Sequence, residues 1–144
     1  PGTGDIQLTL SQKAPVAGAV IVTTPQDIAL LDAMKGVEMF GKVDIPVLGI
    51  LENMSMHCCE ACGHISHPFG EGGGSKISGE LDVPLLGQLP LSMDIRQQAD
   101  GGTPTVRAEP ESAASGLYRD AARHLAARLW TREQAAPTIR MVDD

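Results

Sequence analysis

The chain has 144 residues, a length that suits one domain. Hydrophobic residues make up 42% of it, but it has one Trp, one Tyr and two Phe, so we expect an aliphatic core. The formal net charge is −7, which argues against nucleic acid and anionic membranes as partners, because both attract basic surfaces. The first five residues have neither a basic nor an apolar region, and no apolar run approaches the length of a membrane span. We therefore expect a cytoplasmic protein.

The first half of the chain predicts two buried strands joined by a helix. Residues 16–23 and 46–51 are apolar on both faces, as strands of a parallel sheet are. Between them, Thr24 is a candidate N-cap and Pro25 a first helical residue, and the helix should run to about Lys42. The spacing predicts a buried helix face made of Ile28, Leu31, Met34 and Val37. The earlier segment 5–10 alternates like a strand, but a capped helix is equally open.

The second half predicts one more strand and two helices around a Cys/His-rich insert at residues 53–69. A glycine-rich turn at 70–74 precedes a short helix at 75–81, and the third strand covers 84–89. A final helix should span 111–130, with residues 131–144 as a polar tail. This alternation predicts an α/β fold, a doubly wound and mostly parallel sheet in three α/β/α layers.

In such a sheet, ligands bind beyond the carboxyl ends of the strands. That edge of the sheet is called the rim below. The predicted strands place Thr23 and Thr24, Glu52 and Asn53, and Pro90 together on it.

Two segments resemble phosphate-binding loops, but neither has the context that such a loop requires. Residues 36–43 match GxxxxGK but end in Val43, where a hydroxyl must contact magnesium, and they lie inside the predicted helix. The turn at 70–74 follows no strand and is better explained as the start of a helix. The chain therefore has no Walker A loop, and we assign it no catalytic residue and expect no ATP hydrolysis by it alone.

Cys59 and Cys62 form a CxxC motif followed by Gly63. Two thiolates at this spacing can hold one metal ion or one edge of a cluster, and the glycine allows a tight turn behind them. A four-iron cluster usually needs four thiolates, so the simplest solution is a symmetric homodimer in which each chain supplies two.

Three other interpretations of the CxxC motif stay open. A thioredoxin-like redox pair would open a helix in a βαβ unit, which this insert does not. A closed zinc site is possible because His57, His64 and His67 lie near enough in sequence to complete a tetrahedron. The cysteines could also be ordinary loop residues. The zinc alternative implies a binding module rather than a cluster carrier.

Six short motifs in order and spacing resemble the Mrp/ApbC iron–sulfur cluster carriers over residues 1–130. This family belongs to the deviant Walker A P-loop ATPases, with MinD and the nitrogenase iron protein. The motifs are Pro1-Gly-Thr-Gly-Asp5, Thr23-Thr-Pro-Gln-Asp27, Glu52-Asn-Met-Ser55, Cys59-Glu-Ala-Cys-Gly63, Phe69-Gly-Glu-Gly-Gly73 and Gly101-Gly-Thr-Pro104.

The resemblance implies a function for the cysteine pair. Cys59 and Cys62 are similar to the residues that bridge a 4Fe-4S cluster across the family's homodimer. The implied function is carriage of this cluster and its transfer to apo iron–sulfur client proteins, with ATP as a conformational switch.

The resemblance also implies nucleotide-binding residues. Gly2 is similar to the switch-II glycine that senses the γ-phosphate, and Asp5 lies in the same segment without an assigned role. Asn53 is similar to the asparagine that binds adenine, and Pro90 and Leu91 are similar to the rim that sandwiches the base. The alternatives are a turn cap for Asn53 and a strand terminator for Pro90.

The chain departs from the family pattern in three places. The deviant Walker A loop, switch I and the first strands are absent, and the Walker B aspartate would precede Pro1. Residues 1–130 would thus be the C-terminal part of an ATPase domain that binds ATP and Mg²⁺ only when complete. Cys58 stands where the family usually has an apolar residue, and we recognise no family motif in the tail at 131–144.

Overall fold

The computed structural model describes residue 9 and residues 13–133. Its centre is a parallel sheet of three strands in the order β1-β2-β5. The strands are β1 (Ala19–Thr23), β2 (Val47–Glu52) and β5 (Leu85–Gln88). All three predicted strands are present, and each starts one to three residues later than predicted. Strand β2 ends one residue later than predicted and β5 one residue earlier.

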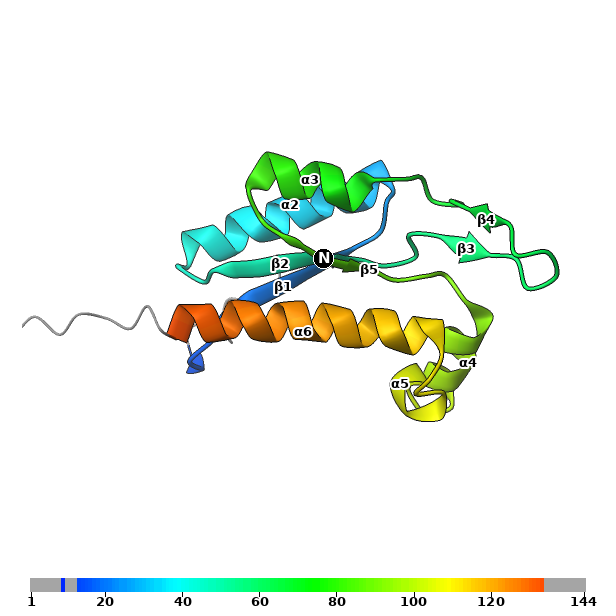
Figure 1. Cartoon of the computed structure of the whole chain (residues 1–144). Helices are drawn as coiled ribbons and strands as arrows, with labels where there is room; N and C mark the ends of the chain where they lie inside the picture. The colour runs from blue at the N-terminus through cyan, green and yellow to red at the C-terminus, as the bar shows by residue number, and fades with distance from the viewer. Residues whose placement is uncertain (1–8, 10–12, 134–144) are drawn as a thin grey trace, which may run out of the picture.

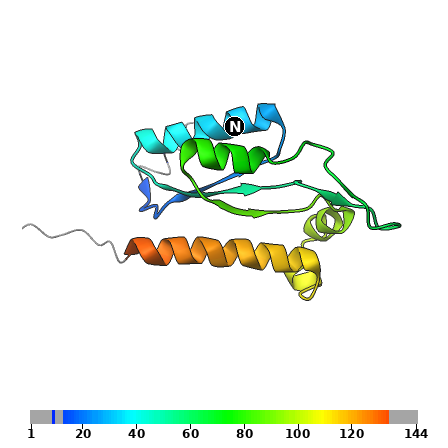
Figure 2. The ribbon, with the colours of Figure 1, turned by 45° about the horizontal axis from the view of Figure 1, so that its top comes forward.

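Helices cover both faces of this sheet. The first face carries α2 (Asp27–Lys42) and α3 (Gly73–Leu81), and the opposite face carries α6 (Ala113–Glu133). Figure 2 shows the three layers edge-on, with the sheet between the helix pair and α6. The predicted α/β fold with three α/β/α layers is therefore confirmed.

The core is aliphatic, as the shortage of aromatic residues indicates. One buried cluster joins α2, the sheet and α3, and burial of each large aliphatic side chain contributes about 2 kcal/mol. Its members are Ile21, Leu30, Ala33, Ile50, Ile77 and Val83.

The start of α2 differs from the prediction. The helix begins at Asp27, and the residue in the N-cap position is Gln26 rather than Thr24. Gln26 keeps an extended backbone (ψ 137°), so Pro25 remains outside the helix. The Thr24 hydroxyl instead bonds to the Gln26 side chain at 2.5 Å.

The predicted buried face of α2 is also wrong for its first half. Ile28 and Leu31 are 76% and 54% exposed, whereas Leu30, Ala33 and Gly36 are buried. Leu30 belongs to the core cluster, and the small side chains of Ala33 and Gly36 let the helix approach the sheet closely. The spacing of Ile28 and Leu31 therefore predicted a neighbouring face of the helix as the buried one.

Several short elements were not predicted. A small antiparallel pair, β3 (His57–Cys58) and β4 (Ile65–Ser66), forms within the Cys/His-rich insert. After β5 come α4 (Met93–Asp100) and α5 (Thr105–Ala108). The sequence does mark the start of α4, because Ser92 is a preferred N-cap residue. Its hydroxyl accepts a hydrogen bond from the N–H of Asp94 at 3.2 Å. None of the helices in the described part of the chain has the length and hydrophobicity that a membrane span requires.

Candidate functional site: a cysteine hairpin beside the rim of the sheet

The rim brings together the residues predicted to meet there. The strand register aligns Thr23 with Glu52 and Glu52 with Gln88. Beyond the strands, the N–H of Asn53 donates to the carbonyl of Thr23 at 2.7 Å. On the other side, the N–H of Leu89 donates to the carbonyl of Glu52 at 2.8 Å. These bonds confirm the predicted convergence at the carboxyl ends of the strands.

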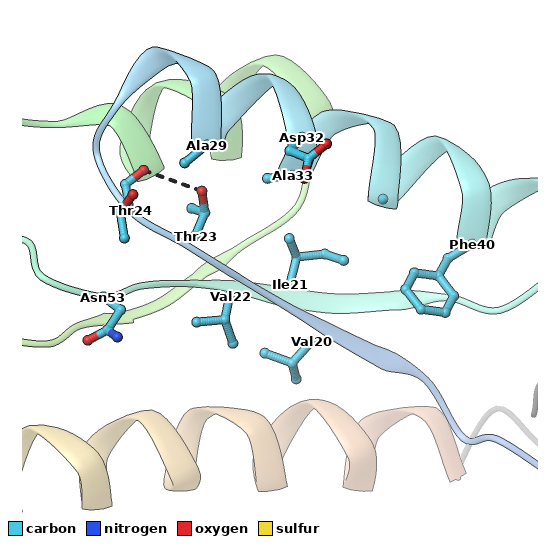
Figure 3. Close-up of a pocket in the computed structure, with 11 residues that line it drawn as sticks. Val20, Ile21, Val22, Thr23, Thr24, Ala29, Asp32, Ala33, Phe40 and Asn53 are labelled. Atoms are coloured by element: carbon cyan, nitrogen blue, oxygen red, sulfur yellow. Dashed lines mark hydrogen bonds between the residues drawn. The ribbon is translucent and has the colours of Figure 1, made fainter. Parts of the chain in front are cut away.

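A groove of about 410 Å³ runs along β1 and α2. Figure 3 shows Asn53 and Thr24 at one end of it and Phe40 at the other. Strand β1 is one of the two outer strands of the three-stranded sheet, and its Val22 side chain is 60% exposed. In the described structure, this edge of the sheet offers unpaired backbone groups beside a groove lined by both polar and apolar side chains.

The predicted nucleotide-binding residues lie in two places. Asn53 lines the groove, and its side-chain oxygen accepts from the N–H of Met54 at 3.0 Å. Pro90 and Leu91 follow β5 on the far side of β2, where the N–H of Leu91 donates to the carbonyl of Met56 at 2.7 Å. Gly2 and Asp5 lie outside the described residues.

The CxxC motif forms the tip of a hairpin that comprises residues 57–66 and is called the cysteine hairpin below. Figure 1 shows it extending from the body at the rim end of the sheet. The N–H of Cys59 donates to the carbonyl of His64 at 2.9 Å, and the N–H of Gly63 donates to the carbonyl of Cys59 at 2.8 Å. Gly63 has a φ of +70°, a left-handed conformation that suits glycine. The tight turn predicted behind the two cysteines is present.

The thiol of Cys59 lies in an environment that favours its ionised form. Its pKa is lowered, first by hydrogen bonds from the N–H groups of Cys62 and Ala61 and then by the Cys62 thiol. Desolvation and the charge of Glu60 act in the opposite direction and are weaker. Cys59 is partly buried and Cys62 is exposed. The thiolate is the form of cysteine that binds iron and other thiolate-seeking metals, so this environment suits a metal ligand.

The closed zinc site has no support in the described residues. Within residue 9 and residues 13–133, no three His, Cys, Asp or Glu side chains lie close enough to hold one metal ion. The Nδ1 atom of His67 instead bonds to the carbonyl of Ser55 at 2.9 Å. Cys58 donates its S–H to the carbonyl of Gly63 at 3.7 Å and so is not gathered with the CxxC pair. One chain therefore presents a two-thiol site.

The glycine-rich turn at 70–74 begins α3, as predicted. Gly73 is packed so closely that a Cβ there would lie 2.8 Å from the carbonyl oxygen of Pro25. The N–H of Gly74 is used by the Glu52 carboxylate. Because the Gly74 N–H already bonds to a carboxylate, it cannot also bind a phosphate. The turn starts a helix and does not form a phosphate-binding loop. The other phosphate-loop match, at 36–43, lies within α2 and its end, also as predicted.

Glu52 is the rim residue to which sequence reasoning gave no function. It is fully buried, and its carboxylate accepts from the Ser55 hydroxyl at 2.6 Å, the Gln88 amide at 2.7 Å and the N–H of Gly74. Burial alone would raise its pKa, but these hydrogen bonds and the charge of His67 hold the pKa below its ordinary value. An acidic residue at the end of an otherwise apolar strand was the available signal.

The fold and its rim define an α/β domain of the P-loop NTPase class. This class is supported by similarity to a solved structure, that of a nucleotide-binding protein from Archaeoglobus fulgidus in complex with ADP. It is 35% identical, with a TM-score of 0.65, over 78% of this chain and 45% of that one.

Within this class, residues 1–126 match the family model of the NUBPL iron-transfer P-loop NTPases, of the ParA type. The chain is 63% identical to the iron-sulfur cluster carrier protein of Pseudomonas fragi over 85% of its own length. It is 50% identical to the mouse iron-sulfur cluster transfer protein NUBPL over 95% of its length. The chain belongs to this family of iron–sulfur cluster carriers. It spans 42% of the length of each of these two relatives.

Proposed function

We propose that a protein containing this chain carries a 4Fe-4S cluster between two identical subunits and transfers it to apo iron–sulfur proteins. Cys59 and Cys62 of each subunit are the proposed ligands. The observation that carries the proposal is the two-thiol site at the tip of an exposed hairpin. Two such sites supply the four thiolates that a 4Fe-4S cluster requires. The cluster is cargo, so an exposed position favours its release.

We also propose that ATP with Mg²⁺ is the switch of the complete protein, with no catalytic residue assigned in this chain. Asn53, Pro90, Leu91 and Gly2 are the proposed nucleotide contacts. The ADP complex of the related Archaeoglobus protein supports this assignment, as does the position of Asn53 at the end of the groove. Phosphate contacts commonly reorder switch segments and thereby change a dimer interface.

The proposed organisation is a partial ATPase domain over residues 1–130, followed by a tail at 131–144. We propose a cytoplasmic protein that works without a nucleic-acid or membrane partner. The acidic net charge of −7 supports this part of the proposal, since such a surface repels polyanions.

Metal analysis of anaerobically purified protein tests the proposed cargo. We expect iron and sulfide with a broad visible absorbance band, at one four-iron cluster per two chains. One zinc ion per chain without sulfide would instead favour the alternative function, a binding module with structural zinc. Because the described residues gather no third donor near the CxxC pair, we expect the iron result.

Residues 1–144 alone should bind ATP weakly. Asn53, Pro90 and Leu91 could contact the base, but no Walker A loop is present to surround the phosphates, which bear most of the charge. Isothermal titration calorimetry of this chain with Mg-ATP should therefore show no saturable binding at micromolar concentrations. Micromolar affinity would contradict the proposal that this chain supplies the base contacts but not the phosphate contacts.

A further inference from the structure

The cysteine hairpin meets the body of the protein at Ser55, two residues before its outgoing arm, and at His67, one residue after its returning arm. Ser55 is 2% exposed, and its N–H donates to the carbonyl of Leu89 just beyond β5 at 2.9 Å. Its hydroxyl donates to the carboxylate of Glu52 at 2.6 Å. The outgoing arm is therefore fixed to the ends of β2 and β5 immediately before the hairpin begins.

The returning arm is tied to the outgoing arm by one side chain. The Nδ1 atom of His67 lies 2.9 Å from the carbonyl oxygen of Ser55. Because a carbonyl can only accept, Nδ1 must bear the proton. The Nε2 atom of His67 lies 3.8 Å from the exposed carboxylate of Glu71, and such a long contact with an exposed group adds little stability. The Nδ1–H bond thus closes the base of the hairpin.

Glu52 joins this base to a third element. One carboxylate oxygen accepts from Ser55 and Gln88, and the other accepts from the N–H of Gly74 in the first turn of α3. The N-cap residue of α3 is Gly72, which has no side chain to offer, so Glu52 supplies the negative charge at this helix N-terminus. A single buried side chain therefore connects β2, β5, α3 and the start of the cysteine hairpin.

We propose that Glu52, Ser55 and His67 are positioning residues that fix the base of the cysteine hairpin to the rim and thereby set where the two thiolates stand. This inference rests on the proposed function for what the thiolates hold. The anchoring itself concerns only residues of this chain. Residues that orient metal ligands commonly change metal affinity 10- to 100-fold when replaced.

The test uses full-length protein that contains this sequence, with His67→Gln and Ser55→Ala as the disrupting variants. Glutamine places its amide nitrogen near the Nε2 position and loses the Nδ1–H bond. His67→Asn is the conservative rescue, since its amide nitrogen can occupy the Nδ1 position. His64→Gln is the matched control, because His64 is an exposed histidine of the same hairpin whose side chain is not part of the anchor.

Amide hydrogen exchange of the metal-free protein is the first measurement. His67→Gln and Ser55→Ala should exchange the N–H groups of Cys59 and Gly63 about 5- to 10-fold faster, the factor expected for one lost hydrogen bond. The N–H of Ile50, which bonds to the carbonyl of Pro84 within the sheet at 2.8 Å, should be unchanged. His67→Asn and His64→Gln should match the parent protein. Equal exchange in all variants, or acceleration of Ile50 together with the hairpin, would overturn the positioning role.

Cluster release to an iron chelator is the second measurement, made on reconstituted protein. We expect release about 10-fold faster from His67→Gln and Ser55→Ala and parental rates from the rescue and control variants. A parent protein that binds no cluster would refute the proposed function, and the exchange pattern would still decide the anchoring. Faster hairpin exchange with unchanged cluster release would refute the inference that the anchor sets the thiolate positions.

Discussion

Replacing Cys59 or Cys62 with serine should abolish cluster binding in reconstituted full-length protein. Each substitution removes two of the four proposed ligands of the dimer, and an alcohol is a poor ligand for iron in such a cluster. Cys59→Ser also removes the sulfur atom that accepts the N–H groups of Cys62 and Ala61. Iron and sulfide content should fall to the background level of unreconstituted protein. Circular dichroism should show that both variants remain folded.

Cys58→Ser is the matched control, because Cys58 is adjacent in sequence but bonds to the carbonyl of Gly63 away from the pair. Its iron and sulfide content should stay near that of the parent protein. Loss of the cluster in Cys58→Ser together with retention in Cys59→Ser would show that the ligands are wrongly assigned. Metal retained by all three serine variants would mean that histidines bind it, and the zinc alternative would then lead.

Gly73→Ala should be the most destabilising of the simple glycine substitutions in α3. The added Cβ would lie 2.8 Å from the carbonyl oxygen of Pro25 and 3.0 Å from its Cα, and backbone atoms cannot rotate away. Overpacking of this kind costs about 3 kcal/mol. In a full-length protein this corresponds to a fall in melting temperature of roughly 10 °C. Differential scanning calorimetry measures it directly.

Gly79→Ala in the same helix is the internal comparison for this prediction. No atom lies within 4 Å of a Cβ built at Gly79, so alanine adds helix propensity without a clash. Its free energy of unfolding should rise by about 0.5–1 kcal/mol. Destabilisation by Gly79→Ala equal to that of Gly73→Ala would show that the close contact with Pro25 is not the cause.

The sheet was predictable because the pattern of its strands is stronger than any competing one. Segments such as 46–51 are apolar on both faces, and at this length the pattern favours a buried strand over a helix. The buried face of α2 was predicted correctly at Met34 and Val37 but wrongly in its first half, where Ile28 and Leu31 are exposed. The buried residues of this helix are Leu30, Ala33 and Gly36, and the small size of Ala33 and Gly36 adds little to a hydrophobic pattern.

The candidate site was predictable where chemistry is local and not where it depends on tertiary contacts. The CxxC-Gly spacing indicated a two-thiol turn, which the hairpin contains. The network around Glu52 joins residues up to 36 positions apart, so no local pattern could reveal that this carboxylate caps α3. The strands of the hairpin could not be predicted either. Each has two residues, too few to show the alternation of apolar and polar residues that marks a strand.

The two-thiol site makes cluster loading depend on protein concentration. If one chain supplies only half of the ligands, loading depends on the concentration of pairs of chains rather than of single chains. By linkage, a cluster that binds only the pair stabilises the pair, and dilution weakens both together. Under the proposed function, loading of the cargo and pairing of the subunits are therefore one equilibrium, so a client that withdraws the cluster also favours separation of its carrier.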